Sequence, residues 1–566
     1  MKNKYLTFIL VFISLISLVA CSSFNLFDSD YDEDEAEDPE IVDASLQIER
    51  ILSIISDDDP EALMGWIHPN AIEKYGREQI VERNQIIHTA IGLKNIELKE
   101  FDSIGGSQYE GEVSYQGLAL YETDYGNIEK SVTYHFIYHP DAERWQLDWT
   151  PSVILPGLHD QGLVQIVPLK AKRGNIYDRS GNVLAHKKYI NRLGVVPATL
   201  QESDIPKIEE NFDLPEGFII KQLEQEWVSQ NTFVPIKTIA ELTNEQSNQA
   251  NTFNLMIQQV ETRTYPLGPA AAHLIGYVGH PTASDLEKEE YQGFTTEDFI
   301  GKSGLEAIYD EQLRGQHGFK VIVTGEYQQV LLEEEAVNGE DFYLTIDSEL
   351  QEMVYNRCQE QNAALTALDP RNGDILALVS TPSYDPEEFV LGISQSSYDE
   401  LINNPSNPLF DKFSQAMSPG STEKILTAIA GFNAGSLSNN TTYNIQGKGW
   451  TYDDSWGNYQ VIRYTVIDGN MDLTGGIVNS DNIYFARVAL DMGIKAFNEQ
   501  MANLQFNQQI SEDYPFGVAQ LSNDGDINDT ILLADTGYGQ GEVLISQAHL
   551  SSIYGAVANG GSWYRP

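Results

Sequence analysis

Hydrophobic and polar residues repeat with two different periods in the first part of the chain. Between residues 48 and 55 apolar side chains recur three and four positions apart, and a second helical pattern covers 79–92. Apolar and polar residues then alternate along 111–123 and 131–139, which is typical of strands. Helices followed by a meander of strands predict a small α+β domain over residues 44–155.

The pattern changes twice further along the chain. Residues 156–338 are predicted to form strands around an Asp-Arg-Ser-Gly turn, then a glycine-broken helix within 262–279 and a helix that begins with Gly-Leu-Glu. A third region, 339–566, starts with the segment 341–354 and continues with a β-hairpin over 363–386, where a Pro-Arg-Asn-Gly turn joins two strands. A glycine-rich run with Lys302 lacks the spacing of a phosphate-binding loop, so no such loop is expected.

The N-terminus predicts export and lipid anchoring. Lys2 and Lys4 precede an apolar run over 5–18 that is too short to span a bilayer comfortably, which is typical of a secretory signal over residues 1–20. The following Leu-Val-Ala-Cys resembles a bacterial lipobox, so Cys21 is predicted to be diacylated and to anchor the protein to the extracytoplasmic face of the cell membrane. An uncleaved signal anchor with an incidental cysteine is the alternative.

Composition narrows the possible partners. The chain carries 34 basic and 84 acidic side chains, a net charge of −50, which repels phosphate backbones and argues against nucleic-acid binding. Nine acids and no base lie within 28–40, so residues 21–43 are predicted to be an extended tether. Besides Cys21 only Cys358 is present, so an acylated Cys21 leaves no intramolecular disulfide. The histidines of the first region, His68, His88, His135 and His139, lack cysteine or acidic partners at ligand spacing and are expected to be structural, and neither a metal nor another cofactor is expected.

The candidate chemistry begins at Ser421, which is predicted to open a helix after Pro419-Gly420. Lys424 follows three residues later and therefore shares one helical face with it. The positive end of the helix dipole favours a serine oxyanion and disfavours a protonated lysine, so the amine could act as the base for a serine nucleophile. A capping serine with a solvent-facing lysine is the simpler alternative for this short pattern.

A second candidate segment is Asn479-Ser480-Asp481-Asn482, which lies between two predicted helices. Ser480 is predicted to relay a proton between Lys424 and a leaving amine, and Asn482 to hold a substrate amide. Asp481 is expected to support the loop without reacting. A purely structural capping loop is the alternative.

Ser-x-x-Lys followed about 60 residues later by Ser-Asp-Asn resembles the motif pair of penicillin-binding proteins and class A β-lactamases. With RGNIYDRSGNVLA, GKSGLEAIYDEQLRG, LDPRNGDILALVS and DTGYGQGEVLIS, the mature chain resembles a class B penicillin-binding protein, a peptidoglycan DD-transpeptidase. Its first domain resembles that of the methicillin-resistance subgroup. The resemblance implies an α+β multidomain protein: a nuclear-transport-factor-like cone, an elongated pedestal (dimerisation) domain, and a β-lactamase/transpeptidase-like domain with a helix-flanked antiparallel sheet.

The resemblance also implies roles and partners. Ser421, Lys424 and Ser480 would be catalytic, and the substrate would be bound by Asn482, Gly539, Gln540 and Gly541. Peptidoglycan stem peptides would be the substrates, β-lactams would acylate the serine with low affinity, and other cell-wall synthesis proteins would be partners.

The third motif of that family, Lys-Thr/Ser-Gly, is not found after Gly541, where only 25 residues follow. The Lys-Ser-Gly at 302–304 belongs to a pedestal motif. We therefore expect these 566 residues to be part of a longer protein, with the transpeptidase domain truncated and inactive by itself because it lacks a carboxylate anchor and half of the oxyanion hole.

Other functions are weighed against this interpretation. A β-lactamase needs a deacylating base and no long pedestal, and a β-lactam sensor needs several membrane spans, which the hydropathy after residue 20 does not show. A catalytically inactive scaffold of the cell-wall machinery keeps the fold without the chemistry and remains the alternative.

Overall fold

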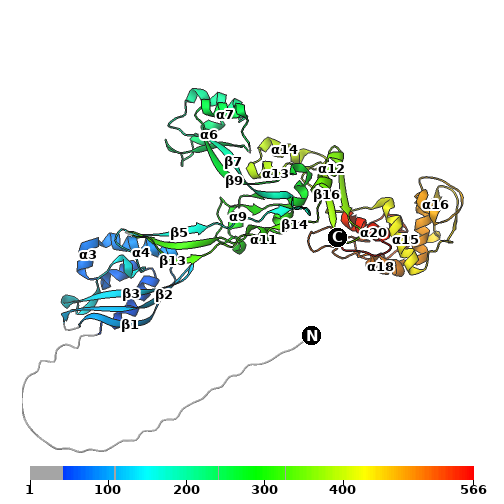
Figure 1. Cartoon of the computed structure of the whole chain (residues 1–566). Coiled ribbons are helices and arrows are strands. Elements are labelled where there is room, and N and C mark those ends of the chain that lie inside the picture. The colour runs from blue at the N-terminus through cyan, green and yellow to red at the C-terminus, as the bar shows by residue number, and fades with distance from the viewer. Residues whose placement is uncertain (1–42, 108–109, 240, 326) are drawn as a thin grey trace, which may run out of the picture. The chain divides into compact units, whose positions relative to one another are not determined.

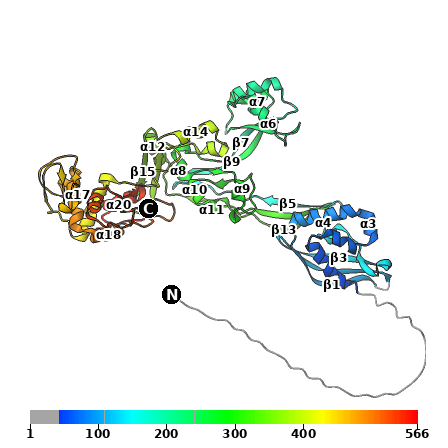
Figure 2. The same cartoon turned by 180° about the vertical axis from the view of Figure 1, so that it is seen from behind.

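The computed structural model describes residues 43–107, 110–239, 241–325 and 327–566. Figures 1 and 2 show the chain from opposite sides. It forms two compact units: residues up to 164 with 323–329 (the N-terminal unit), and residues 165–322 with 330–566 (the C-terminal unit). The signal segment 1–20, Cys21 and the tether up to residue 42 lie outside the described residues.

The N-terminal unit places helices before a four-stranded antiparallel sheet with the order β1-β2-β3-β4. Its core is aromatic, since Tyr121, Tyr134 and Trp145 are at most 1% exposed. The predicted helices and the meander are therefore confirmed. Strand β1 was not predicted, because it carries many polar residues and its register shifts twice against β2. The elements are α1 (Ser45–Ser56), α2 (Pro60–Leu63), α3 (Pro69–Tyr75), α4 (Arg77–Ile91), β1 (Asn95–Ser107), β2 (Glu112–Thr123), β3 (Gly126–His139) and β4 (Arg144–Leu147).

The first part of the C-terminal unit is built around a long strand, β7, which pairs with β6, β8 and β9. The predicted Asp-Arg-Ser-Gly turn joins β6 to β7, and the Asp178 carboxylate accepts hydrogen bonds from the backbone N–H groups of Ser180 and Asn182, 2.8 Å each. The strands are β5 (Leu163–Leu169), β6 (Ile176–Tyr177), β7 (Val183–Val195), β8 (Val234–Ile239), β9 (Met256–Thr264), β10 (Val278–Gly279), β11 (Ile300–Gly301), β12 (Gly318–Thr324), β13 (Gln329–Glu334) and β14 (Phe342–Tyr343).

The helix expected within 262–279 is mostly absent. Strand β9 continues to Thr264, and only α8 (Ala272–Ile275) is α-helical before Gly276, whose φ of 77° ends it. The Gly-Leu-Glu helix is present as α10 (Gly304–Ile308), followed by α11 (Asp310–Arg314). The other helices of this part are α5 (Ile205–Asn211), α6 (Phe218–Leu223), α7 (Asn244–Thr252) and α9 (Ala283–Leu286).

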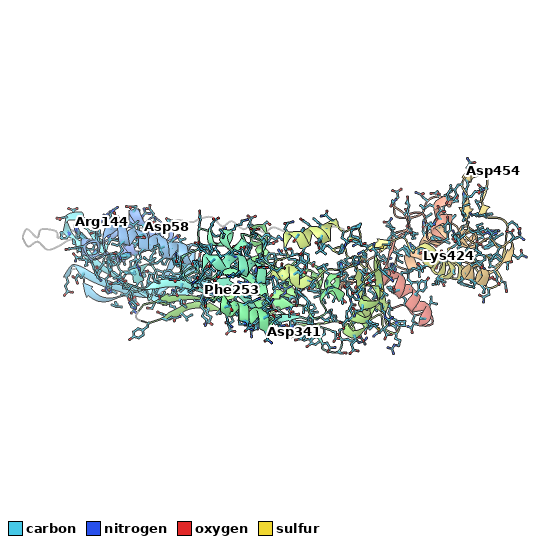
Figure 3. The ribbon with its side chains drawn as sticks, turned by 90° about the horizontal axis from the view of Figure 1, so that it is seen from above. Asp58, Arg144, Phe253, Asp341, Lys424 and Asp454 are labelled. Carbon is cyan, nitrogen blue, oxygen red and sulfur yellow. The ribbon has the colours of Figure 1, made fainter. Side chains whose placement is uncertain are left out.

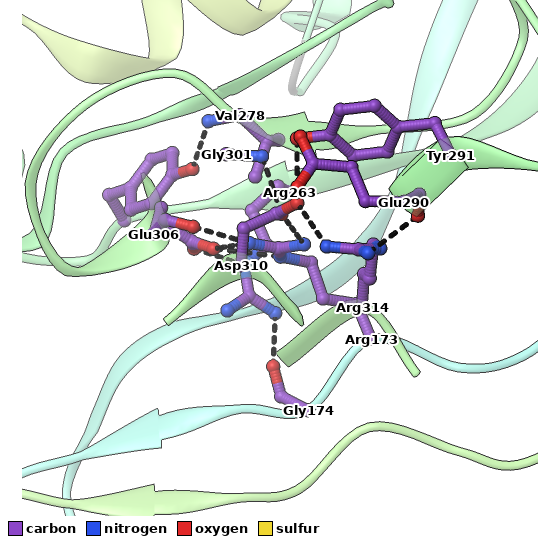
Figure 4. Close-up of polar contacts among 11 residues, drawn as sticks. Arg173, Gly174, Arg263, Val278, Glu290, Tyr291, Gly301, Glu306, Asp310 and Arg314 are labelled. Atoms are coloured by element: carbon purple, nitrogen blue, oxygen red, sulfur yellow. Dashed lines mark hydrogen bonds and ion pairs between the residues drawn. The ribbon is translucent and has the colours of Figure 1, made fainter. Parts of the chain in front are cut away.

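A network of buried charges ties three segments of this part together (Figure 4). Glu306, fully buried, accepts from Arg263 Nε at 2.6 Å and from Arg173 Nε at 2.7 Å. Asp310 accepts from Arg173 at 2.7 Å and from Arg314 at 2.9 Å. Buried charges are tolerated when they are paired in this way, so the three segments that looked structural in the sequence share one ionic core.

The rest of the C-terminal unit contains the predicted hairpin, β15 (Ala363–Leu368) and β16 (Ile375–Thr381), which pair antiparallel. Helix α12 (Ser348–Cys358) contacts β16 and α20 (Gln547–Ala558) contacts β15, so the expected helix-flanked antiparallel sheet is present. The other helices are α13 (Pro386–Leu391), α14 (Gln395–Asn403), α15 (Glu423–Ala434), α16 (Leu473–Val478), α17 (Asn482–Met492), α18 (Ile494–Asn503) and α19 (Thr530–Thr536).

Short strand pairs complete this part: β17 (Ala416–Met417) with β22 (Ile545–Ser546), β18 (Tyr443–Ile445) with β21 (Gly469–Met471), and β19 (Gly449–Trp450) with β20 (Val461–Ile462). Helix α15 packs against α17 and α18 around a buried apolar core. Among the described residues, no helix combines the length and the apolar character needed to cross a membrane.

Candidate active site

Ser421 lies in a short 3-10 turn, η8 (Gly420–Thr422), which leads directly into α15. The sequence placed Ser421 at the start of the α-helix itself, and the structure moves that start to Glu423. The turn holds Ser421 at the surface while the next residues, Glu423 and Lys424, are buried. The simpler alternative of a capping serine with a solvent-facing lysine therefore does not hold.

The Lys424 amine is the centre of a compact polar cluster, and the residue is only 3% exposed. Figure 3 labels Lys424 among the side chains of the chain. Its Nζ lies 3.0 Å from Ser421 Oγ and 2.8 Å from Ser480 Oγ. It also lies 2.7 Å from the Ser480 carbonyl oxygen and 2.7 Å from Asn482 Oδ1. The two serine hydroxyls are 2.9 Å apart, so Ser421, Lys424 and Ser480 form a closed three-membered cycle of hydrogen bonds.

Burial lowers the pKa of Lys424 from 10.5 to about 8, and the nearby negative charge of Asp481 opposes that shift. A neutral amine has two N–H donors and one lone pair. The Ser480 carbonyl and the Asn482 amide oxygen can only accept, so they take the two donors. The lone pair is left for a hydroxyl proton, and this is the arrangement that a general base requires.

The loop between α16 and α17 presents these acceptors. Asp481 is the N-cap of α17, where its side chain accepts the Tyr484 N–H at 3.0 Å. Ser480 has a φ of 51°, a left-handed conformation uncommon for a residue other than glycine. This conformation lets both its carbonyl and its hydroxyl face Lys424. Asn482 is fixed from the other side, because its Nδ2 donates to the Ile462 carbonyl at 2.8 Å.

Of the three residues predicted in the Gly-Gln-Gly segment, Gly539 lies next to the nucleophile. It has a φ of 85°, and a Cβ there would lie 1.7 Å from the Gly420 carbonyl oxygen, so only glycine permits this packing. The Gln540 side chain is exposed, and Gly541 lies against Leu532. These two residues are not part of the cycle around Lys424.

Two buried side chains were missed by the sequence reasoning. Arg463, fully buried, pairs with Asp481 at 3.2 Å. Glu423 is also fully buried, and within the described structure neither of its carboxylate oxygens has a hydrogen-bond partner. Burial raises the pKa of Glu423 well above its ordinary value and so favours its uncharged form. No spacing pattern in the sequence pointed to Arg463, whereas Glu423 could have been noticed because it lies inside the Ser-Thr-Glu-Lys motif.

The Lys-Ser-Gly at 302–304 makes contacts of its own. Lys302 Nζ pairs with Asp285 at 2.8 Å, and Gly304 packs against the backbone of Gly276. This agrees with the interpretation of that sequence as structural. Across the part of the chain that the structure describes, no cluster of three or more metal-ligating side chains is found.

Three family models match the sequence: an NTF2-like N-terminal transpeptidase domain over residues 44–162, a penicillin-binding protein dimerisation domain over 168–344, and a penicillin-binding protein transpeptidase domain over 363–566. Penicillin-binding protein 3 of Bacillus subtilis (strain 168) is 32% identical over 588 residues, which covers 100% of this chain and 83% of that protein. Peptidoglycan D,D-transpeptidase MrdA of Escherichia coli (strain K12) is 31% identical over 371 residues, which covers 61% of this chain and 57% of MrdA.

Solved structures show the same fold. PBP2 of Helicobacter pylori, solved in complex with MreC, has a TM-score of 0.57 at 22% identity and covers 71% of this chain and 78% of that one. PBP2 of Pseudomonas aeruginosa, solved in complex with WCK 5153, has a TM-score of 0.52 at 24% identity, with coverages of 71% and 72%.

Proposed function

Since the chain belongs to the class B penicillin-binding proteins, we propose that it is a peptidoglycan DD-transpeptidase that works through a Ser421 acyl-enzyme. The observation that carries this proposal is the closed cycle of Ser421, Lys424 and Ser480 around a buried amine. A loop that only capped a helix would not need the free lone pair of the Lys424 amine next to the exposed Ser421 hydroxyl.

The reaction follows from the cycle. Ser421 Oγ attacks the carbonyl carbon of the penultimate D-Ala of a stem peptide, and its proton passes to Lys424 Nζ. The proton then reaches the nitrogen of the terminal D-Ala through the Ser480 hydroxyl, and the C–N bond breaks as D-Ala leaves. An amine of a neighbouring stem attacks the Ser421 ester, gives up a proton along the same path, and the Ser421 hydroxyl is restored.

The substrate contacts are part of the same proposal. Asn482 would hold a substrate amide, and the segment Gly539-Gln540-Gly541 would line the site beside the Ser421 turn. β-Lactams would acylate Ser421 as mimics of the D-Ala-D-Ala end and stay attached, with low affinity suggested by the methicillin-resistance-type first domain.

The remaining sequence predictions complete the proposal. Residues 44–155, 156–338 and 339–566 would form the N-terminal, pedestal and transpeptidase domains. A diacylated Cys21 and the acidic tether would hold them at the outer face of the cell membrane. Other cell-wall synthesis proteins would be partners, and the complex of the Helicobacter PBP2 with MreC is a precedent within this fold.

The test is release of D-Ala and formation of a cross-linked product when the full-length gene product is incubated with a D-Ala-D-Ala stem peptide and an acceptor amine. We expect both products from the wild type and from Ser438→Ala, a control at an exposed serine beyond α15. Neither product should form with Ser421→Ala. Wild-type protein that releases no D-Ala and forms no product would favour the inactive scaffold.

A further inference from the structure

Arg463 is a fully buried arginine, and each of its three guanidinium nitrogens donates at least one hydrogen bond. It follows β20 and donates to the carbonyl oxygens of Gly447 at 2.7 Å and Ile467 at 2.8 Å, and to Asp468 at 2.8 Å. Its remaining contact is with Asp481 Oδ2 at 3.2 Å. One side chain therefore joins both ends of the segment 447–468 to the loop that carries Ser480.

Asp481 stands between the two residues that hold the Lys424 amine. Ser480, on one side, supplies a carbonyl oxygen and a hydroxyl, and Asn482, on the other, supplies an amide oxygen. The Asn482 side chain is oriented by the carbonyl of Ile462, the residue directly before Arg463. Arg463 is thus linked to the residues around the Lys424 amine in two ways. It contacts Asp481 directly, and the carbonyl of its neighbour Ile462 holds Asn482.

The charges of the residues around Lys424 influence whether its amine is protonated. The Asp481 side chain is 0% exposed, and its negative charge favours the protonated form of Lys424. The Arg463 guanidinium, also 0% exposed, carries the opposite charge and pairs with that carboxylate at 3.2 Å. Asp468, the second partner of Arg463, has a side chain that is 55% exposed and therefore largely screened by water. On α15 itself, burial raises the pKa of Glu423 and favours its uncharged form.

Resting on the proposed acyl-transfer function, we propose that Arg463 is a positioning residue of this active site. It locks Asp481 and the Ser480–Asn482 loop in place, and by neutralising Asp481 it keeps the Lys424 amine free to act as the base. Without Arg463, Asp481 would be a buried carboxylate whose nearest counter-charge is the Lys424 ammonium. Such a carboxylate stabilises the protonated amine and so withdraws the base.

The test measures the rate of acylation by a fluorescent penicillin between pH 6 and 10 in four proteins. Arg463→Met removes the charge and keeps much of the volume. Arg463→Met/Asp481→Asn removes both charges of the pair, and asparagine still caps α17. Arg487→Met is the control, since Arg487 lies on α17 next to the loop, and its guanidinium packs over the Tyr443 ring and donates to the Asn444 carbonyl.

We expect the midpoint of the Arg463→Met profile to move by about one pH unit or more to the alkaline side, which corresponds to about a tenfold loss of rate below the midpoint. The double variant should return the midpoint toward the wild-type value, and Arg487→Met should not move it. An unmoved midpoint in Arg463→Met, or an equal shift in Arg487→Met, would overturn the proposal.

A second readout separates this inference from the proposed function. In protein labelled with [6-13C]lysine, the Lys424 Cε resonance is assigned by its loss in Lys424→Arg and titrated directly. We expect the alkaline shift in Arg463→Met and its reversal in the double variant whether or not penicillin reacts. A wild type that is not acylated would contradict the proposed function alone, while an unchanged Lys424 titration in Arg463→Met would contradict the role of Arg463.

Discussion

Replacing Gly539 with alanine should disable the active site without touching any of its reactive groups. Gly539 lies against the backbone that leads into Ser421, and an added Cβ would meet the Gly420 carbonyl oxygen at 1.7 Å and the Glu423 Cβ at 2.9 Å. Neither neighbour is the flexible end of a side chain. The backbone on one side of the contact must therefore move.

The size of that movement sets the expected effect. Because Cβ contacts below 3.0 Å essentially do not occur, the Gly420 and Gly539 segments must separate by more than about 1 Å. A misplacement of about 1 Å in a catalytic group can cost about 100-fold in rate. Alanine at a φ of 85° adds about 1–2 kcal/mol of backbone strain. We expect acylation of Gly539→Ala to be about 100-fold slower, with a modest fall in Tm.

The assay is the second-order rate constant for a fluorescent penicillin, followed by stopped flow, together with thermal unfolding. Gly435→Ala is the matched control: Gly435 ends the same helix α15 with a φ of 73° and has open space around it, so alanine there adds strain without a clash. It should lose stability but keep the wild-type rate. Wild-type acylation of Gly539→Ala would refute the view that this contact positions Ser421.

Three further outcomes are expected. The acylation rate should rise with pH, reach half of its maximum near pH 8 and level off at higher pH, because only the neutral Lys424 amine is a base; a rate independent of pH from 6 to 9 would contradict this. Glu423→Gln should raise Tm more at pH 8 than at pH 5. Burial raises the pKa of Glu423, so the wild type loses stability as the pH rises above the ordinary carboxyl pKa, and glutamine does not. Calorimetry at both pH values tests this, with the exposed Glu360→Gln as a control that should show no such difference. Glu306→Ala should lower the free energy of unfolding of the C-terminal unit by about 3–5 kcal/mol in urea, since two buried arginines lose their partner, whereas exposed Glu311→Ala should have almost no effect.

Local patterns in the sequence predicted local structure well. The apolar spacing before residue 92 and the alternation after residue 111 gave helices and strands that the structure confirms, because in both cases one face is buried. The Pro-Arg-Asn-Gly turn within 363–386 correctly predicted a hairpin, which the structure shows as β15 paired with β16. The prediction of a helix within 262–279 was largely wrong, because the prolines and glycines there end each helical turn almost as soon as it starts.

Non-local features of the site could not be predicted in the same way. The three-residue spacing of Ser421 and Lys424 predicted that they meet, but only family resemblance joined them to Ser480, 56 residues beyond Lys424. Arg463 gave no signal, because its role depends on burial next to Asp481, which the fold creates. Gln540, predicted to bind substrate, has an exposed side chain, and its role stays a prediction.

The most direct test of the central claim is where a penicillin becomes attached. The full-length gene product is incubated with benzylpenicillin, its intact mass is measured, and the modified peptide is sequenced by mass spectrometry. The Ser421–Lys424–Ser480 cycle predicts one penicillin per chain, bound as an ester to Ser421 and absent from Ser421→Ala. An adduct on another residue, or one that persists in Ser421→Ala, would contradict it.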